Sequence, residues 1–170
     1  MQFRDLKAQY LHYKEEINSA IENVLLNTNF IGGKEVSELE DQLAKYIGTK
    51  HCISCANGTD ALMLVVMGWG IKEGDAVFVP DFTFFATGEI VSFQGATPVF
   101  VDVDKETFNL NPIKLEQTIQ KTINEGKLTP KAVIPVDLFG LPANYPEIEK
   151  IAKKYNLLVL EDGAQGFGGH

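Results

Sequence analysis

Residues 157–170 read LLVLEDGAQGFGGH, and this stretch indicates how the chain folds. The apolar run Leu157–Leu160 is typical of a short strand buried on both faces of a parallel sheet. Two carboxylates, Glu161 and Asp162, end the run, and a loop of small residues follows. Ligands bind at the carboxyl ends of the strands in such sheets, where a carboxylate needs a cation or hydrogen-bond donors. Asp162 is therefore a candidate ligand contact, although an aspartate followed by glycine also caps ordinary turns.

Strand and helix patterns alternate ahead of this stretch. Apolar runs bounded by turn residues predict strands at 51–56, 76–80, 97–103, 131–138 and 157–161. Amphipathic spacing predicts the intervening helices at 60–69, 83–94, 112–125 and 145–155. Because this alternation is typical of βα units, we expect an α/β fold with a mostly parallel sheet and flanking helices.

Two more helices are expected before the first strand. Apolar residues recur at threes and fours over Asp5–Leu26 and again over Glu35–Tyr46, with a flexible Gly32–Gly33 break between them. The sequence therefore predicts a helical N-terminal arm at residues 1–34 and a single ligand-binding domain over residues 35–170.

The composition narrows the class of partner. The chain has 170 residues, a formal net charge of −8 and a hydrophobic content of 45%, which together indicate an acidic globular protein. This charge argues against nucleic acid and anionic membranes as partners. No apolar run approaches the ~20 residues needed to span a bilayer, and MQFRDLKAQY at the N-terminus has no apolar signal core. We expect a cytoplasmic protein.

A C-x-x-C pair, Cys52 and Cys55, stands beside His51. Such a pair can bind a metal or carry out redox chemistry. Residues three apart on a strand point to opposite faces, however, which opposes both a disulfide and shared coordination. We therefore predict no metal site and expect both thiols to be buried structural groups.

The tetrapeptide Asn57-Gly58-Thr59-Asp60 connects the first expected strand to a helix. Free amides and the dipole at a helix N-terminus attract phosphate. Gly58 allows close approach of the backbone, and Thr59 adds a hydroxyl. The tetrapeptide is neither G-x-x-x-x-G-K-[ST] nor G-x-G-x-x-G, so it carries no nucleoside-triphosphate or dinucleotide fingerprint. Taken alone, it is read more simply as a turn with an N-cap.

Three phenylalanines, Phe82, Phe84 and Phe85, follow the next strand. Helical spacing favours Phe82 and Phe85 as core residues, whereas a ring that faces the cleft would stack on a flat ligand. A phosphate cradle, an aromatic ring and a carboxylate at one sheet edge suit a planar, phosphorylated, cationic heterocycle. Pyridoxal 5′-phosphate is such a molecule, and Asp162 would pair with its pyridinium nitrogen.

Six motifs along the chain resemble those of one enzyme family. They are FIGG (30–33), CANGTDAL (55–62), PDFTFFATGEI (80–90), TFNLNP (107–112), IPVDLFGLPAN (134–144) and EDGAQGFGG (161–169). In this order they resemble the DegT-like sugar aminotransferases, which are pyridoxal-phosphate enzymes of the aspartate-aminotransferase (fold type I) architecture. The resemblance is greatest to the branch acting on UDP-linked 3-keto sugars, such as the 3-oxo-glucuronate aminotransferases.

The resemblance implies roles for individual residues. Those at the positions that hold the cofactor phosphate are Gly58, Thr59 and Asp60. Phe84 matches the aromatic that stacks on the pyridine ring, Asp162 the partner of the pyridinium nitrogen, and Gln165 the side chain that hydrogen-bonds the ring hydroxyl. Two residues depart from the pattern, since many members have His where Asp137 stands and Gln or Cys where Leu141 stands.

Family members are much longer than this chain, and their Schiff-base lysine follows the EDGAQ motif in a Ser-x-x-x-x-Lys segment. The resemblance thus implies that this lysine and the small C-terminal domain lie beyond residue 170. Lys153 and Lys154 fall in the helix before the last strand, on the wrong side of the sheet edge. We expect no catalytic residue in this chain and no transamination by it alone.

For the whole enzyme, the resemblance implies amination of a nucleotide-linked keto-sugar for polysaccharide synthesis, with glutamate as the amino donor and a homodimeric assembly. Two alternatives remain open. One is a non-catalytic remnant that binds the cofactor or a partner. The other is a sugar dehydratase relative in which His replaces the lysine.

Overall fold

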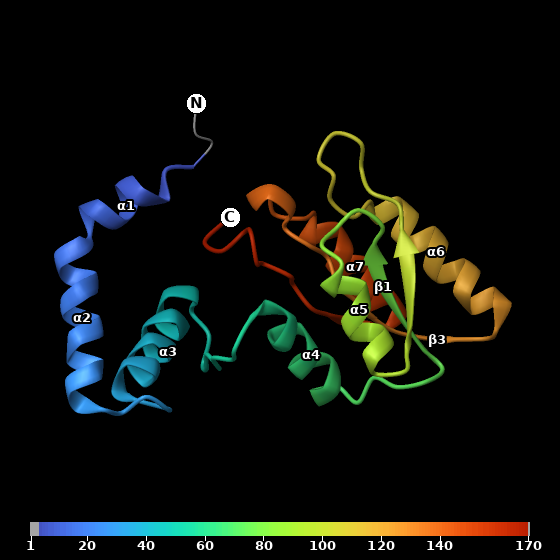
Figure 1. Cartoon of the computed structure of the whole chain (residues 1–170). Coiled ribbons are helices and arrows are strands. Elements are labelled where there is room, and N and C mark those ends of the chain that lie inside the picture. The colour runs from blue at the N-terminus through green and yellow to red at the C-terminus, as the bar shows by residue number, and fades with distance from the viewer. Residues whose placement is uncertain (1–3, 170) are drawn as a thin grey trace. The chain divides into compact units, whose positions relative to one another are not determined.

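The structure, a computed structural model, describes residues 4–169. Residues 1–3 of the predicted 1–34 arm lie outside the described residues, as does His170 of the predicted 35–170 domain. The chain divides into two compact units, one ending at Ser54 and the other beginning at Cys55 (Figure 1). The arm and the larger domain expected from the sequence remain a prediction. No helix within residues 4–169 is both long and apolar enough to cross a membrane.

The described part of the first unit, residues 4–54, contains three helices: α1 (Leu6–His12), α2 (Lys14–Asn27) and α3 (Lys34–Ile47). The single helix predicted over Asp5–Leu26 is wrong in one respect, because it breaks at Tyr13, whose backbone (φ −103°, ψ 13°) leaves the helical region. The predicted second helix is confirmed, and Gly48 ends it in the left-handed conformation (φ +81°) that glycine adopts without strain. Neither α1 nor α2 has a buried residue.

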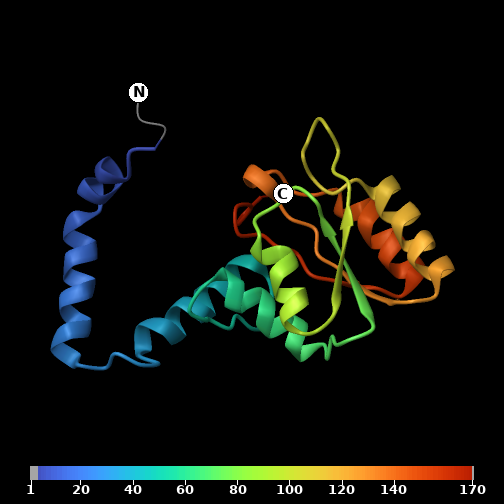
Figure 2. The same ribbon diagram turned by 45° about the vertical axis from the view of Figure 1, so that its right-hand side comes forward.

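The second unit is built on a parallel sheet. Its strands are β1 (Asp75–Pro80), β2 (Thr97–Val101), β3 (Thr129–Val133) and β4 (Leu158–Val159). They lie in the order β2-β1-β3-β4, so that β1 and β3 are the inner strands and β2 and β4 are the edges. Figure 2 shows β1, in green, beside β2, in yellow-green. All three pairings are parallel, which confirms the α/β fold expected from the sequence.

Helices cover both faces of this sheet: α4 (Gly58–Gly68) and α5 (Ala86–Phe93) on one, α6 (Pro112–Glu125) and α7 (Tyr145–Tyr155) on the other (Figure 1). Strand alternation explains the two layers, because successive side chains of β1 point to opposite faces. One core cluster includes Ala76, Phe78, Leu115, Ile119 and Ile148. The other includes Leu62, Val66, Val77, Val79 and Ile90.

Two strand predictions are wrong, and both failures concern pairing. Residues 51–56 form no strand, since a strand exists only with a ladder partner and this segment has none among residues 4–169. Ser54 instead donates its N–H and hydroxyl to Oε1 of Glu40, both at 2.7 Å. The last strand is buried only in part, because β4 pairs with β3 alone and Leu158 is 42% exposed.

The cysteine prediction also fails in part. Cys52 is half-buried and Cys55 is exposed, and both are free thiols. The expectation that both are buried assumed a strand, which the chain does not form here. Cys55 Sγ donates to the carbonyl oxygen of Asn57 at 3.2 Å, so this thiol supports the turn that leads into α4.

Candidate functional site

A cavity of about 210 Å³ lies in the second unit at the carboxyl edge of the sheet. Its lining includes five of the six residues predicted from the sequence, namely Gly58, Thr59, Phe84, Asp162 and Gln165. Pockets for drug-sized ligands hold about 300–1,000 Å³. This cavity is smaller than that range, so it suits one molecule below drug size. The sixth predicted residue, Asp60, does not line it.

The N-terminus of α4 forms one wall of this cavity. Asn57 caps the helix, since its Oδ1 accepts from the N–H of Asp60 at 2.9 Å. Asn57 Nδ2 also donates to Asp60 Oδ2 at 3.1 Å, so Asp60 supports the cap from outside the cavity. The N–H groups of Gly58 and Thr59 have no acceptor within the described chain. The same helix end therefore has an N-cap and two amides without an acceptor among residues 4–169, and these amides suit a phosphate.

Asp162 is the buried carboxylate of the cavity, at 8% exposure. Its Oδ1 accepts from the N–H of Ala164 at 3.3 Å, which is the turn that the sequence also allowed. Its Oδ2 accepts from the Thr87 hydroxyl at 3.3 Å, and the hydroxyls of Thr83 and Thr87 share a hydrogen bond of 3.0 Å. A backbone bridge to Val136 fixes the position of the residue in the sheet. These contacts hold a carboxylate at the cavity wall, as a cationic ring nitrogen would require.

Thr87 is a site residue that the sequence analysis missed. It is fully buried in the first turn of α5, and its hydroxyl hydrogen-bonds Asp162, which lies 75 residues later in the sequence. Its place in the segment that follows β1, which ends at Pro80, was the one available signal, because such segments lie at the carboxyl edge of a parallel sheet.

Gln165 joins the cavity to a neighbouring loop. Its Oε1 accepts from the N–H of Phe139 at 2.6 Å, within the short 3₁₀ turn η1 (Leu138–Gly140). A backbone N–H can pair only with the amide oxygen, so the bond determines which end of the amide is which. The NH₂ group has no hydrogen-bond partner among the described residues and remains open to a ligand.

The phenylalanines lie in a loop, because α5 begins at Ala86 rather than at residue 83. Phe84 lines the cavity and is 72% exposed, so its face is open to a ligand. The prediction that Phe82 and Phe85 are core residues is wrong, since both are exposed. Phe82 instead packs against Phe108, with ring centroids 5.7 Å apart.

Asp137, one of the two departures from the family pattern, is 2% exposed and ties two loops together. Its Oδ1 accepts from the N–H of Ala143 at 3.0 Å and from the hydroxyl of Tyr145 at 2.8 Å. Burial raises the pKa of Tyr145, and the Asp137 carboxylate adds to this shift. Burial, together with Asp137, also raises the pKa of Glu161. Asp137, which stands between the cavity residues Val136 and Leu138 in the sequence, thus helps to raise the pKa of two neighbouring groups.

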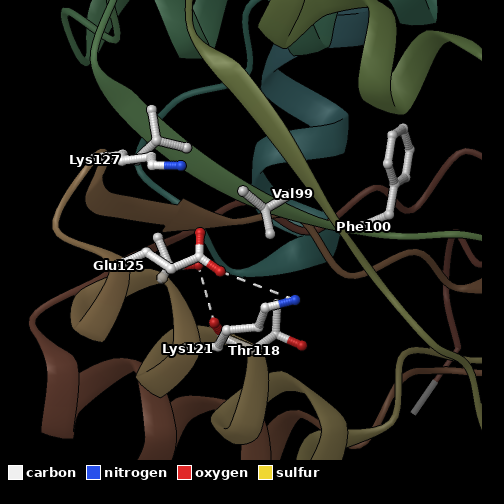
Figure 3. A pocket seen from close by; sticks show the side chains of 8 residues that line it. Val99, Phe100, Thr118, Lys121, Glu125 and Lys127 are labelled. Carbon is white, nitrogen blue, oxygen red and sulfur yellow. Dashed lines mark hydrogen bonds and ion pairs between the residues drawn. The ribbon is translucent and has the colours of Figure 1, made fainter.

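A second hollow, of about 260 Å³, lies between β2 and α6 (Figure 3). Its polar groups bond to one another: Lys121 Nζ lies 4.0 Å from Glu125 Oε1, and Thr122 donates to the carbonyl of Thr118 at 2.9 Å. None of the predicted site residues lines it. The hollow is therefore unrelated to the candidate site.

A parallel sheet with a helix end, an aromatic ring and a buried carboxylate around one small cavity defines an α/β protein with a candidate ligand site at the carboxyl edge of its sheet. Comparison with known proteins identifies the protein family. Residues 12–170 match the DegT/DnrJ/EryC1/StrS aminotransferase family, and the chain belongs to that family.

Individual relatives are similar over almost the whole chain. The UDP-2-acetamido-2-deoxy-3-oxo-D-glucuronate aminotransferase of Pseudomonas aeruginosa is 48% identical over 99% of this chain and 45% of its own length. A DegT/DnrJ/EryC1/StrS aminotransferase structure from Brucella abortus superposes with a TM-score of 0.97, at 52% identity over 99% of this chain and 45% of that one. The chain thus spans less than half the length of these relatives.

A third comparison bears on the cofactor. The ntda structure from Bacillus subtilis, with bound cofactor PMP, superposes with a TM-score of 0.84 at 32% identity, over 92% of this chain and 34% of that one. The predicted fold type I architecture and the family resemblance are both confirmed.

Proposed function

We propose that this chain supplies the pyridoxal-phosphate-binding part of an aminotransferase that aminates a nucleotide-linked 3-keto sugar. The observation that carries the proposal is the convergence of five predicted residues, from segments far apart in the sequence, on one cavity of about 210 Å³. Similarity to a 3-oxo-glucuronate aminotransferase supports the substrate class. Glutamate as donor, a homodimer, a role in surface-glycan synthesis and a cytoplasmic location belong to the same proposal.

Each residue has a distinct part in holding the cofactor. The amides of Gly58 and Thr59, with the Thr59 hydroxyl, would bind the phosphate, and Asp60 would keep the helix end in place through its bonds to Asn57. Phe84 would cover one face of the ring. When bound, the cofactor supplies an electron sink for amino-group transfer.

Two side chains would set the electronic state of the ring. Asp162 would keep the ring nitrogen protonated, because an opposite charge favours the charged form. The NH₂ group of Gln165 would donate to the ring hydroxyl. The chain's own groups thus bind and orient the cofactor, while the Schiff-base lysine is proposed to lie beyond residue 170.

Titration of the chain with pyridoxamine 5′-phosphate tests the proposal, because this amine form needs no lysine to bind. We expect saturable binding that Asp162→Asn weakens at least tenfold, since the substitution keeps the shape of the side chain but removes its charge. Asp102→Asn, at an exposed position on the same unit, is the matched control and should bind as the unsubstituted chain does. Absence of binding by the unsubstituted chain, or equal binding by Asp162→Asn, would contradict the proposal.

A further inference from the structure

The loop that holds Gln165 is strained. Phe139 has a left-handed backbone (φ +58°, ψ 17°), which is uncommon for a non-glycine residue, and Gly140 follows at φ +88°. A Cβ at residue 140 would lie 3.2 Å from the carbonyl oxygen of Gln165, so this position has little room for a side chain. Such strain persists only where the surroundings over-determine the backbone, and it marks functional positions.

Asn109 supplies that support from another segment of the chain. It is 5% exposed, and its Nδ2 donates to the carbonyls of Leu141 (2.9 Å) and Pro142 (3.2 Å). Its Oδ1 accepts from the N–H of Leu138 at 3.2 Å. One buried amide therefore bonds the backbone on both sides of the strained Phe139-Gly140 pair.

We propose that Asn109 is a positioning residue for the cofactor-binding amide of Gln165. Asn109 holds the 138–142 loop, the loop presents the N–H of Phe139, and that N–H binds Oε1 of Gln165 at 2.6 Å. The NH₂ group of Gln165 is thereby kept available to the ring hydroxyl of the cofactor. Among residues 4–169, the N–H of Phe139 is the only group that hydrogen-bonds the Gln165 side chain. The inference rests on the proposed function for its ligand and on the loop geometry for its mechanism.

Asn109→Ala tests the mechanism without any ligand. Loss of the three bonds should increase hydrogen exchange at the Phe139 amide at least fivefold more than at amides of β1. Asn111→Ala is the matched control, because Asn111 lies in the same loop but caps α6 through Ile113 and Lys114. It should reduce overall stability while leaving the relative protection of Phe139 unchanged. Equal exchange at Phe139 in the two variants would overturn the proposal.

Binding of pyridoxamine 5′-phosphate tests the consequence. In Asn109→Ala the affinity for this ligand should fall about fivefold, as expected for loss of the one hydrogen bond between the Gln165 NH₂ group and the ring hydroxyl. The absorption of the bound ligand should also show its ring hydroxyl ionising at higher pH, because a donor to the oxygen favours the ionised form. A merely structural role would not move this ionisation, and Asn111→Ala should not move it. Loss of Phe139 protection without a shift in ionisation would overturn the positioning role.

Two further results separate the possible failures. If Asn109→Ala does not fold, Asn109→Asp takes its place: it keeps an oxygen for the N–H of Leu138, loses the donor hydrogens, and should show the same two effects. If the unsubstituted chain does not bind the ligand, the proposed function fails and the ligand part of this proposal fails with it. The exchange rate at Phe139 still decides whether Asn109 holds the loop.

Discussion

The Thr87 hydroxyl donates a hydrogen bond of 3.3 Å to Oδ2 of Asp162, joining the first turn of α5 to the loop after β4. Thr87 is fully buried, so this bond is shielded from competing water. A positioned, hydrogen-bonded carboxylate is better preorganised for a cationic ring than one free to rotate.

Thr87→Val should therefore weaken binding of pyridoxamine 5′-phosphate. Valine has nearly the shape of threonine but no donor, and one hydrogen bond contributes about 1 kcal/mol, or about fivefold in affinity. Thr122→Val is the control, because Thr122 is also buried but donates to the carbonyl of Thr118 within α6. Calorimetric titration measures the affinity of both variants for the ligand. If Thr87→Val and Thr122→Val bind it equally well, Thr87 has no part in the site.

Asn57→Ala should affect both stability and binding. Loss of an N-cap costs about 1 kcal/mol of folding free energy, and the unsupported helix end should bind phosphate less well. Asn144→Ala removes the cap of α7, where Asn144 Oδ1 accepts from Glu147 at 3.4 Å. Both variants should show lower urea midpoints, but only Asn57→Ala should show lower affinity for pyridoxamine 5′-phosphate. A matching loss of affinity in Asn144→Ala would show that the effect comes from stability alone.

Gly166→Ala should destabilise the second unit by about 1–3 kcal/mol, the usual range for overpacking. A Cβ at residue 166 would overlap Cβ of Asp137, whose carboxylate accepts hydrogen bonds from Ala143 and Tyr145 and therefore cannot move freely. Gly163→Ala is the control, since the nearest atoms to its Cβ would belong to the flexible Glu161 side chain, with Oε1 at 3.3 Å. Urea denaturation measures both changes, and an equal effect of the two substitutions would contradict the packing argument.

Glu161 should make stability fall with rising pH. Burial and the neighbouring Asp137 raise its pKa above the ordinary value of 4.5. The folded chain therefore retains this proton to a higher pH than the unfolded chain does. Protonation favours folding, and the contribution is lost as the pH rises through the raised pKa.

Glu161→Gln cannot ionise, so its stability should decline less than that of the unsubstituted chain as the pH rises from the ordinary pKa of 4.5 through the raised pKa. Urea midpoints measured at several pH values give the two slopes. Identical slopes would show that Glu161 has the same pKa in the folded and unfolded states.

Local signals were enough to predict the helices on one face of the sheet. The predicted bounds 112–125 and 145–155 equal those of α6 and α7, because each helix has its cap and its stop in its own sequence. Asn111 and Asn144 cap the starts, and Gly126 and Asn156 end the helices in the left-handed conformation.

Features that depend on distant partners were not predictable in this way. Residues 51–56 have a strand-like pattern but no strand to pair with in the described chain. Thr87 and Asn109 look like ordinary polar residues in the sequence, and their importance comes from partners that only the fold brings close. The family motifs supplied Gln165, whereas its bond to Phe139 required the structure.

The strand order also determines when the site can form during synthesis. β1 is the first of the four described strands to leave the ribosome and is an inner strand of the sheet, with β2 following soon after it. Its other edge stays unpaired until α6 and β3 have been made, which is a period of risk for edge-to-edge association. Asp162 and Gln165 emerge last of the cavity residues. The nascent chain therefore has a paired β-strand core well before the last described residues that line the cavity have been made.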